Sequence, residues 1–317
     1  MMIGDTMSSE KVFKTLDEQI EILKNKGLII DDIEHAKDVL LRENYFFVSG
    51  YRHLFMQNNK PNKFIPGTTF DELYAMFYFD RSMRNIFFKH ILIIENNIKS
   101  LISYEMSKKY GFKEKDYLNV DNFTQNPMKV RQVHDILDKM RRQIRVNGKQ
   151  HTATLHYMSN YGYIPLWILV KVLSFGIVSE LYTILKEEDQ NSISNFYKID
   201  PSTLSIYLAV LSNYRNLCAH EDILYEHHTQ RSIPDNQYHE KLNISKSTEE
   251  QEYLYGKNDL FAVVIILKIM LTDKEFRNFI NEVSYELDFL EGRINSITRD
   301  SVLKNIGFPS NWREIID

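Results

Sequence analysis

The sequence predicts an all-α protein. Only 11 Gly and 7 Pro occur among its 317 residues, too few for the turns that many short strands would need. Hydrophobic residues make up 43% of the chain, with 19 Tyr and 19 Phe, enough to fill one large core or two smaller ones. In the longest segments these residues recur with the spacing of a helix face, so we expect helices almost throughout.

The first helices are expected over residues 15–26 and 31–43, where the pattern is amphipathic. Gly27 should end the first of them. Residues 58–67 are rich in Asn, Pro and Gly and predict a loop.

A long helix should follow over residues 70–109. Thr69 and Glu72 have the spacing of a capping box, in which the hydroxyl and the carboxylate each accept a hydrogen bond from a backbone N–H. Gly111 is well placed to end this helix. Further helices are expected over residues 130–145, over the apolar stretch 164–185 with Pro165 in its first turn, from Asp200 and Pro201 to about residue 224, and over 260–290.

These elements suggest three parts. Residues 1–66 should form an N-terminal helical segment that docks on the rest of the protein. Residues 67–226 should form a helical core. Residues 227–317 should begin with a polar, irregular surface excursion and close with a C-terminal helical segment.

The charge and the cysteine content exclude several classes of protein. The net charge of -4 gives no global basic field, so any contact with nucleic acid has to rest on a local patch. A single cysteine, Cys218, permits neither an intramolecular disulfide nor a CxxC zinc site. The N-terminus shows no cleavable apolar segment, and the longest apolar run, 260–272, is too short to span a bilayer. We expect a soluble, cytoplasmic protein without a membrane partner.

The helix expected over residues 200–224 carries an arginine in an unusual place. At about 100° per residue, Leu204, Tyr207, Leu208, Leu211, Tyr214 and Cys218 form one broad apolar face, and Ser205, Ser212, Asn213, Asn216 and His220 form a narrow polar strip. Arg215 projects from within the apolar face, where an unpaired guanidinium would be costly to bury. A carboxylate partner or an anionic ligand is therefore implied.

Glu95 is the candidate partner. It falls on the apolar stripe of the long helix, with Phe88, Ile91, Ile98 and Ile102. Two charges on two apolar faces suggest that Glu95 and Arg215 approach one another in the folded core. The alternative is that each side chain reaches solvent or pairs elsewhere.

Asn216 and His220 are four residues apart and share a helix face. Cleavage of RNA by its own 2′-hydroxyl needs a group that exchanges a proton near neutral pH, which an imidazole can do. It also needs a cation on the scissile phosphate, which Arg215 could supply, and neither step requires a metal. The R-x4-H spacing alone is weak, because it occurs by chance and a helical histidine is more often structural.

A family resemblance strengthens this interpretation. The segment RNLCAH, residues 215–220, matches the RN-x-x-x-H signature of HEPN ribonucleases, and residues 212–225 resemble the version found in Abi-like proteins. Four further segments resemble blocks of that family in the same order: 45–55, 79–100, 164–182 and 307–312. The resemblance covers nearly all of residues 12–317.

The resemblance implies a HEPN-like helical bundle with additional N- and C-terminal helices, the core being residues 67–226. It implies a metal-independent endoribonuclease that needs no cofactor and acts as a homodimer. This enzyme would be an antiphage abortive-infection toxin that cleaves RNA, and a small RNA or protein antitoxin could restrain it. Arg215, Asn216 and His220 would be catalytic, with Glu95 supporting. His220 would act as general acid or base, Arg215 would stabilise the phosphate, and Asn216 would orient His220 or the substrate. The alternative is a non-catalytic RNA-binding or sensor module that uses the HEPN scaffold for dimerisation.

Other candidates have structural explanations of their own. Arg84 and His90 give an R-x5-H pattern, which could be a second motif that completes the site within one chain. His90 points more than a quarter turn away from Arg84, however, so the two should not converge. Cys218, on the apolar face, is expected to be a buried hydrophobe rather than a nucleophile.

Three further clusters are candidates for ligand binding. The basic cluster of Lys139, Arg141, Arg142, Arg145 and Lys149 could track an RNA backbone, although a solvated helix end is the commoner explanation. Tyr157, Tyr161 and Tyr163 could stack on unpaired bases or pack in the core. His227, His228 and His239 lack the spacing of metal ligands, so surface histidines and no metal are expected.

Overall fold

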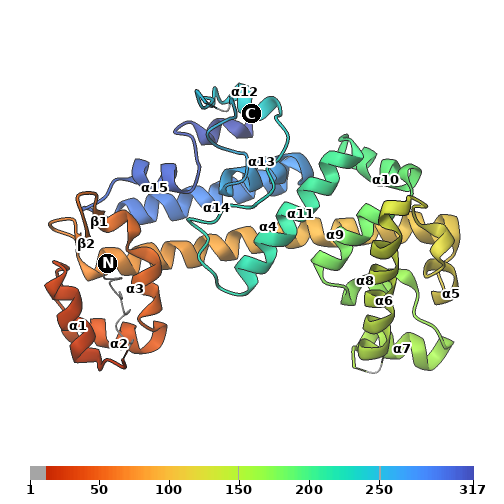
Figure 1. The fold of residues 1–317 in the computed structure, drawn as a ribbon, viewed down its shortest axis with the longest axis horizontal. Coiled ribbons are helices and arrows are strands. Elements are labelled where there is room, and N and C mark those ends of the chain that lie inside the picture. Colours follow the sequence, from red (N-terminus) through yellow and green to blue (C-terminus); the bar gives the residue numbers. More distant parts are fainter. Residues whose placement is uncertain (1–11, 149, 250) are drawn as a thin grey trace, which may run out of the picture. The chain divides into compact units, whose positions relative to one another are not determined.

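The computed structural model describes residues 12–148, 150–249 and 251–317. Over these ranges it contains fifteen α-helices, five 3-10 helices and one two-stranded sheet (Figure 1). The predicted all-α class is confirmed. The sheet is a hairpin of β1 (Met56–Gln57) and β2 (Lys60–Phe64), which begins before the predicted loop and includes part of it.

Internal contacts group the chain into two compact units. Among the described residues, the first contains those up to Asp80 together with Glu286–Val302, and the second contains those of 81–285 and Leu303–Asp317. The first unit holds α1 (Leu16–Asn25), α2 (Ile33–Glu43), α3 (Phe46–Tyr51), η1 (His53–Phe55), the hairpin, the start of α4 (Phe70–Tyr110), the end of α14 (Asp273–Glu291) and the start of α15 (Arg299–Asn305).

The helix starts predicted in the first unit are confirmed. Thr15 caps α1 in a capping box with Glu18, and Gly27, just beyond the helix, has a φ of +92°. Thr69 and Glu72 form the predicted box at α4: the Glu72 carboxylate accepts from the Thr69 N–H at 2.9 Å, and the Thr69 hydroxyl accepts from the Glu72 N–H at 3.2 Å. Local sequence therefore fixes where these helices begin.

The second unit holds the rest of α4 and most of the remaining helices. These are α5 (Glu114–Tyr117), η2 (Val120–Asn122), η3 (Pro127–Lys129), α6 (Val130–Asn147), α7 (Thr152–Tyr161), α8 (Leu166–Val172), α9 (Phe175–Ile184), α10 (Glu187–Ser194), η4 (Asn195–Tyr197), α11 (Pro201–Ala219), α12 (Gln237–Lys241), α13 (Leu260–Met270), most of α14 and η5 (Trp312–Ile316). No helix of the described chain is both long and apolar enough to cross a bilayer.

Two stretches predicted as continuous helix are broken by polar caps. Ser174 accepts a hydrogen bond from the Ile177 N–H and separates α8 from α9. Thr272 accepts one from the Glu275 N–H and separates α13 from α14. Pro165 precedes α8 as its N-cap rather than lying in the first turn. Short hydroxyl side chains compete with the helix for backbone donors, which explains both breaks.

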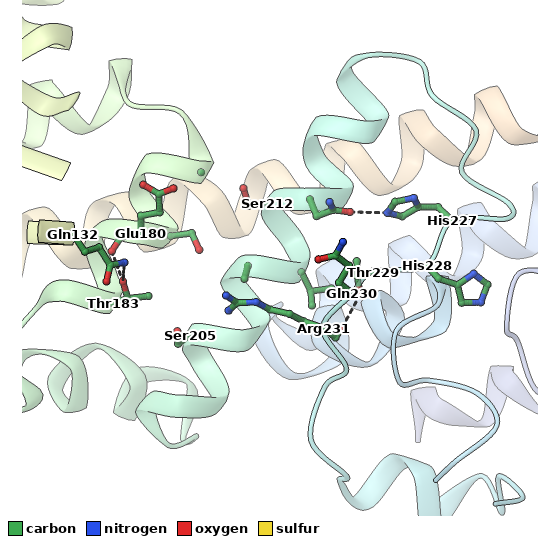
Figure 2. A pocket seen from close by; sticks show the side chains of 15 residues that line it. Gln132, Glu180, Thr183, Ser205, Ser212, His227, His228, Thr229, Gln230 and Arg231 are labelled. Carbon is green, nitrogen blue, oxygen red and sulfur yellow. Dashed lines mark hydrogen bonds between the residues drawn. The ribbon is translucent and has the colours of Figure 1, made fainter. Parts of the chain in front are cut away.

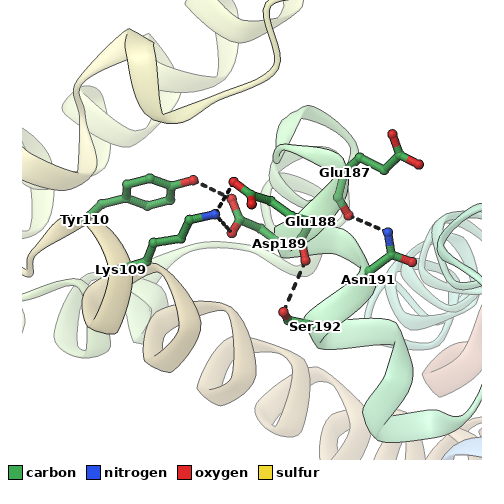
Figure 3. A network of polar contacts seen from close by, with 7 residues as sticks. All are labelled: Lys109, Tyr110, Glu187, Glu188, Asp189, Asn191 and Ser192. Atoms are coloured by element: carbon green, nitrogen blue, oxygen red, sulfur yellow. Dashed lines mark hydrogen bonds and ion pairs between the residues drawn. The ribbon is translucent and has the colours of Figure 1, made fainter.

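The core of the second unit forms around α11. This helix packs against α9, α10 and α13, and α9 also packs against α6. Leu204, Leu208, Leu211 and Tyr214 on its predicted apolar face are fully buried. At the far end of α4, Lys109 pairs with Glu188 and with Asp189 at 2.7 Å, and the Tyr110 hydroxyl donates to Asp189 at 2.7 Å (Figure 3). These contacts fix the end of α4 to α10.

The N-cap of α11 predicts that the stability of the protein falls in acid. Asp200 accepts hydrogen bonds from the Ser202 hydroxyl and from the Thr203 hydroxyl and N–H, and these lower the pKa of Asp200 to about 2. Because this value lies below the ordinary 3.8, the stabilisation is present above about pH 4 and is lost as the pH falls towards 2. Asp200→Ala should therefore lower the free energy of unfolding by about 1 kcal/mol at pH 7, with a smaller difference at pH 2.5.

Urea denaturation at both pH values measures this effect. Asp200→Asn is the control, because an asparagine also caps a helix and does not titrate. A cost of Asp200→Ala that is the same at both pH values would contradict the assignment.

Candidate functional site

The residues of the RNLCAH segment lie at the C-terminal end of α11. The helix ends at Ala219, and His220 is its C-cap, so the predicted end near residue 224 is wrong. Glu221 takes a left-handed φ of 57°, and the Asp222 N–H donates to the Leu217 carbonyl at 3.2 Å. This is the backbone closure of a Schellman motif, which stops the helix although no glycine is present. His220 is exposed at the point where the helix stops.

The predicted approach of Glu95 and Arg215 is confirmed. The Arg215 Nε donates to the Glu95 Oε2 at 3.1 Å, and the Arg215 guanidinium lies 5.4 Å from the centre of the Phe88 ring. The Glu95 side chain is only 6% exposed, and that of Arg215 is 27% exposed. Helix α4 therefore holds Arg215 through an ion pair and an aromatic ring at once.

A second cation shares the Glu95 carboxylate. The Lys99 Nζ lies 2.7 Å from the Glu95 Oε1, and the Lys99 side chain is 13% exposed. Two cations on one carboxylate leave a net positive charge at the site. We did not predict Lys99, although its spacing of four residues from Glu95 on one helix could have identified it.

The ion pair uses only one nitrogen of the Arg215 guanidinium. Within the described residues the two terminal nitrogens, Nη1 and Nη2, make no hydrogen bond. The partly exposed guanidinium can thus be held by Glu95 and still present two donors to a phosphate, which is the geometry that makes arginine a phosphate ligand.

Asn216 and His220 are both exposed. In the part of the chain that the structure describes, the side chain of neither residue makes a hydrogen bond, and nothing joins Asn216 to His220. The structure therefore brings Arg215 together with Glu95 but does not bring Asn216 or His220 into contact with that pair. Their catalytic roles stay predictions.

The N-terminal part of the polar strip lines a pocket of about 610 Å³ (Figure 2). Ser205, Ser212 and Asn213 lie on α11, and Figure 2 shows Gln132, Glu180 and Thr183 on one side of the pocket with His227 and His228 on the other. The His227 Nε2 lies 2.6 Å from the Asn213 Oδ1. Burial and the neighbouring His228 lower the pKa of His227, so this histidine is neutral at pH 7 and donates to Asn213.

The Arg84 and His90 pattern does not form a site. Both side chains are buried, and the His90 Nδ1 lies 2.8 Å from the Ile86 carbonyl with its ring edge-on to Phe279. The Arg84 Nη1 donates to the Asp222 carbonyl at 3.3 Å. Arg84 thus supports the turn that follows His220, and His90 packs in the core. Cys218 is also buried, as predicted.

The basic cluster of α6 is partly neutralised. Lys139 pairs with Glu180, and Arg141 pairs with Asp138 at 2.9 Å. Arg142 and Arg145 are exposed, and Lys149 lies outside the described residues. RNA binding by this cluster stays a prediction.

One of the three histidines expected at the surface is in fact buried. His239 is 0% exposed, its ring stacks on Tyr253 at 4.6 Å, and its Nε2 lies 2.8 Å from the Gly256 carbonyl. The surface prediction is therefore wrong for His239, because the polar segment after His227 folds back on itself. Among the described residues, no group of three His, Cys, Asp or Glu side chains is arranged to hold a metal ion.

Comparison with known proteins identifies a family. The family described as Abi-like protein matches residues 38–226, more than half of the chain. This range contains Glu95 on α4 and the three residues Arg215, Asn216 and His220 on α11. No curated protein and no solved structure matches the chain.

Proposed function

The chain belongs to the Abi-like protein family, and from this premise we propose that it is a metal-independent HEPN endoribonuclease that cleaves RNA as an abortive-infection toxin. Family membership itself suggests a role in abortive infection. The observation that carries the ribonuclease proposal is the pairing of Arg215 with Glu95, which leaves two guanidinium donors available on the helix that ends at the exposed His220.

The proposed reaction is attack of a ribose 2′-hydroxyl on the adjacent phosphorus. The new O–P bond forms as the bond to the 5′-oxygen breaks, which gives a 2′,3′-cyclic phosphate and a 5′-hydroxyl. One imidazole either takes the proton of the 2′-hydroxyl or gives a proton to the leaving oxygen. Arg215 stabilises the negative charge on the phosphate oxygens in the transition state.

Two proton transfers call for two groups, and each chain offers one such histidine in its motif. A homodimer in which two copies of α11 meet would supply both, so we propose a composite site between two copies. Glu95 supports Arg215 by fixing its Nε, and Asn216 orients the partner imidazole or the substrate. Restraint of such a toxin in its own cell would need an antitoxin, either a small RNA or a protein.

The test is incubation of the purified protein with total RNA and with tRNA in the presence of a chelator. We expect cleavage with 2′,3′-cyclic phosphate ends, and loss of cleavage in Arg215→Ala and in His220→Ala. Absence of cleavage by the parent, or equal cleavage by both variants, would contradict the proposal.

A non-catalytic RNA-binding or sensor role is the second candidate. It is favoured by the observation that no hydrogen bond within the described chain orients His220. Growth on induced expression separates the two functions. Toxicity that the double variant Arg215→Ala, His220→Ala relieves supports the nuclease, and toxicity that survives it supports the sensor.

A further inference from the structure

The face of α4 that carries Glu95 continues as the wall of an open groove. Two pockets of about 570 and 460 Å³ adjoin, because both are lined by Ser100, Ser103 and Trp167. The first is also lined by Glu95, Lys99 and Lys171, and the second by Tyr104, Lys108 and Phe112. We call these two pockets together the α4 groove. It leads from the carboxylate that holds Arg215 towards the C-terminal end of α4.

A row of aromatic rings extends from this groove. Trp167 is 40% exposed, and its ring lies 5.4 Å from that of Phe112. Ring contacts then lead from Phe112 to Tyr163 at 5.8 Å, on to Tyr161 at 6.3 Å, and to Tyr157 at 5.4 Å. We call these five residues the aromatic row.

None of the five rings of the aromatic row is buried, and Tyr161 is 58% exposed. None of the three tyrosines therefore belongs to the fully buried core. Partly exposed rings held against one another are platforms on which unpaired bases can stack.

The groove also carries positive charge that the protein does not neutralise. Lys99 and Arg215 share the single carboxylate of Glu95. Lys171 and Lys108 have no carboxylate within ion-pair distance over the described residues. In contrast, the neighbouring Lys109 is fully engaged by Glu188 and Asp189 (Figure 3).

We propose that the α4 groove and the aromatic row bind an unpaired strand of RNA and lead it to Arg215. Bases would stack on Trp167 and on the tyrosines, and backbone phosphates would lie against Lys99 and Lys171. This inference rests on the proposed function and narrows its substrate to single-stranded RNA. A duplex keeps its bases stacked inside the helix, where rings on a protein surface cannot reach them.

The experiment measures binding in the His220→Ala background, in which the RNA should stay intact. A fluorescently labelled, unstructured 12-nucleotide RNA is titrated at low salt, with anisotropy as the readout. Trp167→Leu and Lys171→Ala together should weaken binding about tenfold or more, since one stacked base and one phosphate contact are lost. A duplex of the same sequence should bind more weakly than the single strand.

Two matched controls identify the surface. Phe196→Ala removes an aromatic ring that is 63% exposed and lies outside the groove, and it should leave the affinity within twofold. Arg142→Ala with Arg145→Ala tests the basic cluster of α6 as the competing RNA-binding surface. Loss of affinity in the α6 variant, with full affinity in the Trp167→Leu, Lys171→Ala variant, would overturn the proposal.

The outcomes separate this inference from the ribonuclease proposal. We call the Trp167→Leu, Lys171→Ala protein the groove variant. If the parent never cleaves RNA but the groove variant binds RNA more weakly, the ribonuclease proposal is contradicted and the groove proposal is supported. If the parent cleaves RNA but the groove variant has an unchanged affinity and an unchanged KM, the ribonuclease proposal is supported and the groove proposal is contradicted. Trp167→Leu retains an apolar contact with Phe112, and circular dichroism of each variant checks that the fold is intact.

Discussion

Replacement of Glu95 by alanine should lower the free energy of unfolding by about 3 kcal/mol, because the change leaves two poorly exposed cations without their carboxylate. Lys99 is 13% exposed and Arg215 is 27% exposed, so neither is fully hydrated in the folded protein. Urea denaturation at pH 7 measures the loss. Glu95→Gln keeps the volume and one hydrogen-bond acceptor and should cost less than Glu95→Ala.

The matched control lies on the same helix. Lys89 on α4 pairs with Glu282 on α14 at 2.6 Å, but the two side chains are 55% and 35% exposed. Glu282→Ala should therefore cost less than about 1 kcal/mol. Equal losses for Glu95→Ala and Glu282→Ala would mean that the Glu95 pair behaves as a surface ion pair. A Glu95→Gln protein as stable and as active as the parent would remove its supporting role.

The second large effect is expected at His220. His220→Ala should lower the rate of RNA cleavage by about 10² to 10⁴, the usual contribution of a general acid or base. The stability should not change, because His220 is exposed and its side chain makes no hydrogen bond in the described structure. Single-turnover cleavage and thermal unfolding measure the two quantities separately.

His90 is the control, because the opposite result is expected there. It is 2% exposed, and His90→Ala should lower the free energy of unfolding by about 2 kcal/mol while folded protein still cleaves RNA. Burial lowers the pKa of His90 below its ordinary 6.5. The contribution of His90 to the free energy of unfolding is therefore full above that pH and falls as the pH decreases. The stability difference between the parent and His90→Ala should therefore shrink in acid. A His220→Ala protein that unfolds like His90→Ala would assign His220 a structural role.

The Glu95–Arg215 contact could be predicted because it depends on local geometry. Each charge lies within the apolar stripe of its own helix, and helical periodicity alone places both in the core. The burial penalty for a lone charge then favours a contact between them. The caps at Thr69 and Asp200 were predictable for the same reason, since three or four residues contain the whole signal.

Other features depend on contacts between distant segments and could not be predicted. Glu221 takes the left-handed conformation without being glycine or asparagine, so the sequence gives no sign that α11 ends at Ala219. The burial of His239 depends on Tyr253, 14 residues later. The α4 groove exists only because α8 places Trp167 and Lys171 beside α4. Single-helix periodicity carries no information on such packing.

The two contacts that α4 makes with the motif have a mechanical consequence. Arg84 holds the carbonyl of Asp222, just after His220, and Glu95 holds the guanidinium of Arg215. Arg84 and Glu95 are 11 residues apart on one continuous helix, roughly 16 Å along its axis. One continuous helix therefore anchors both ends of the RNLCAH segment, and these two anchors keep their spacing unless α4 bends.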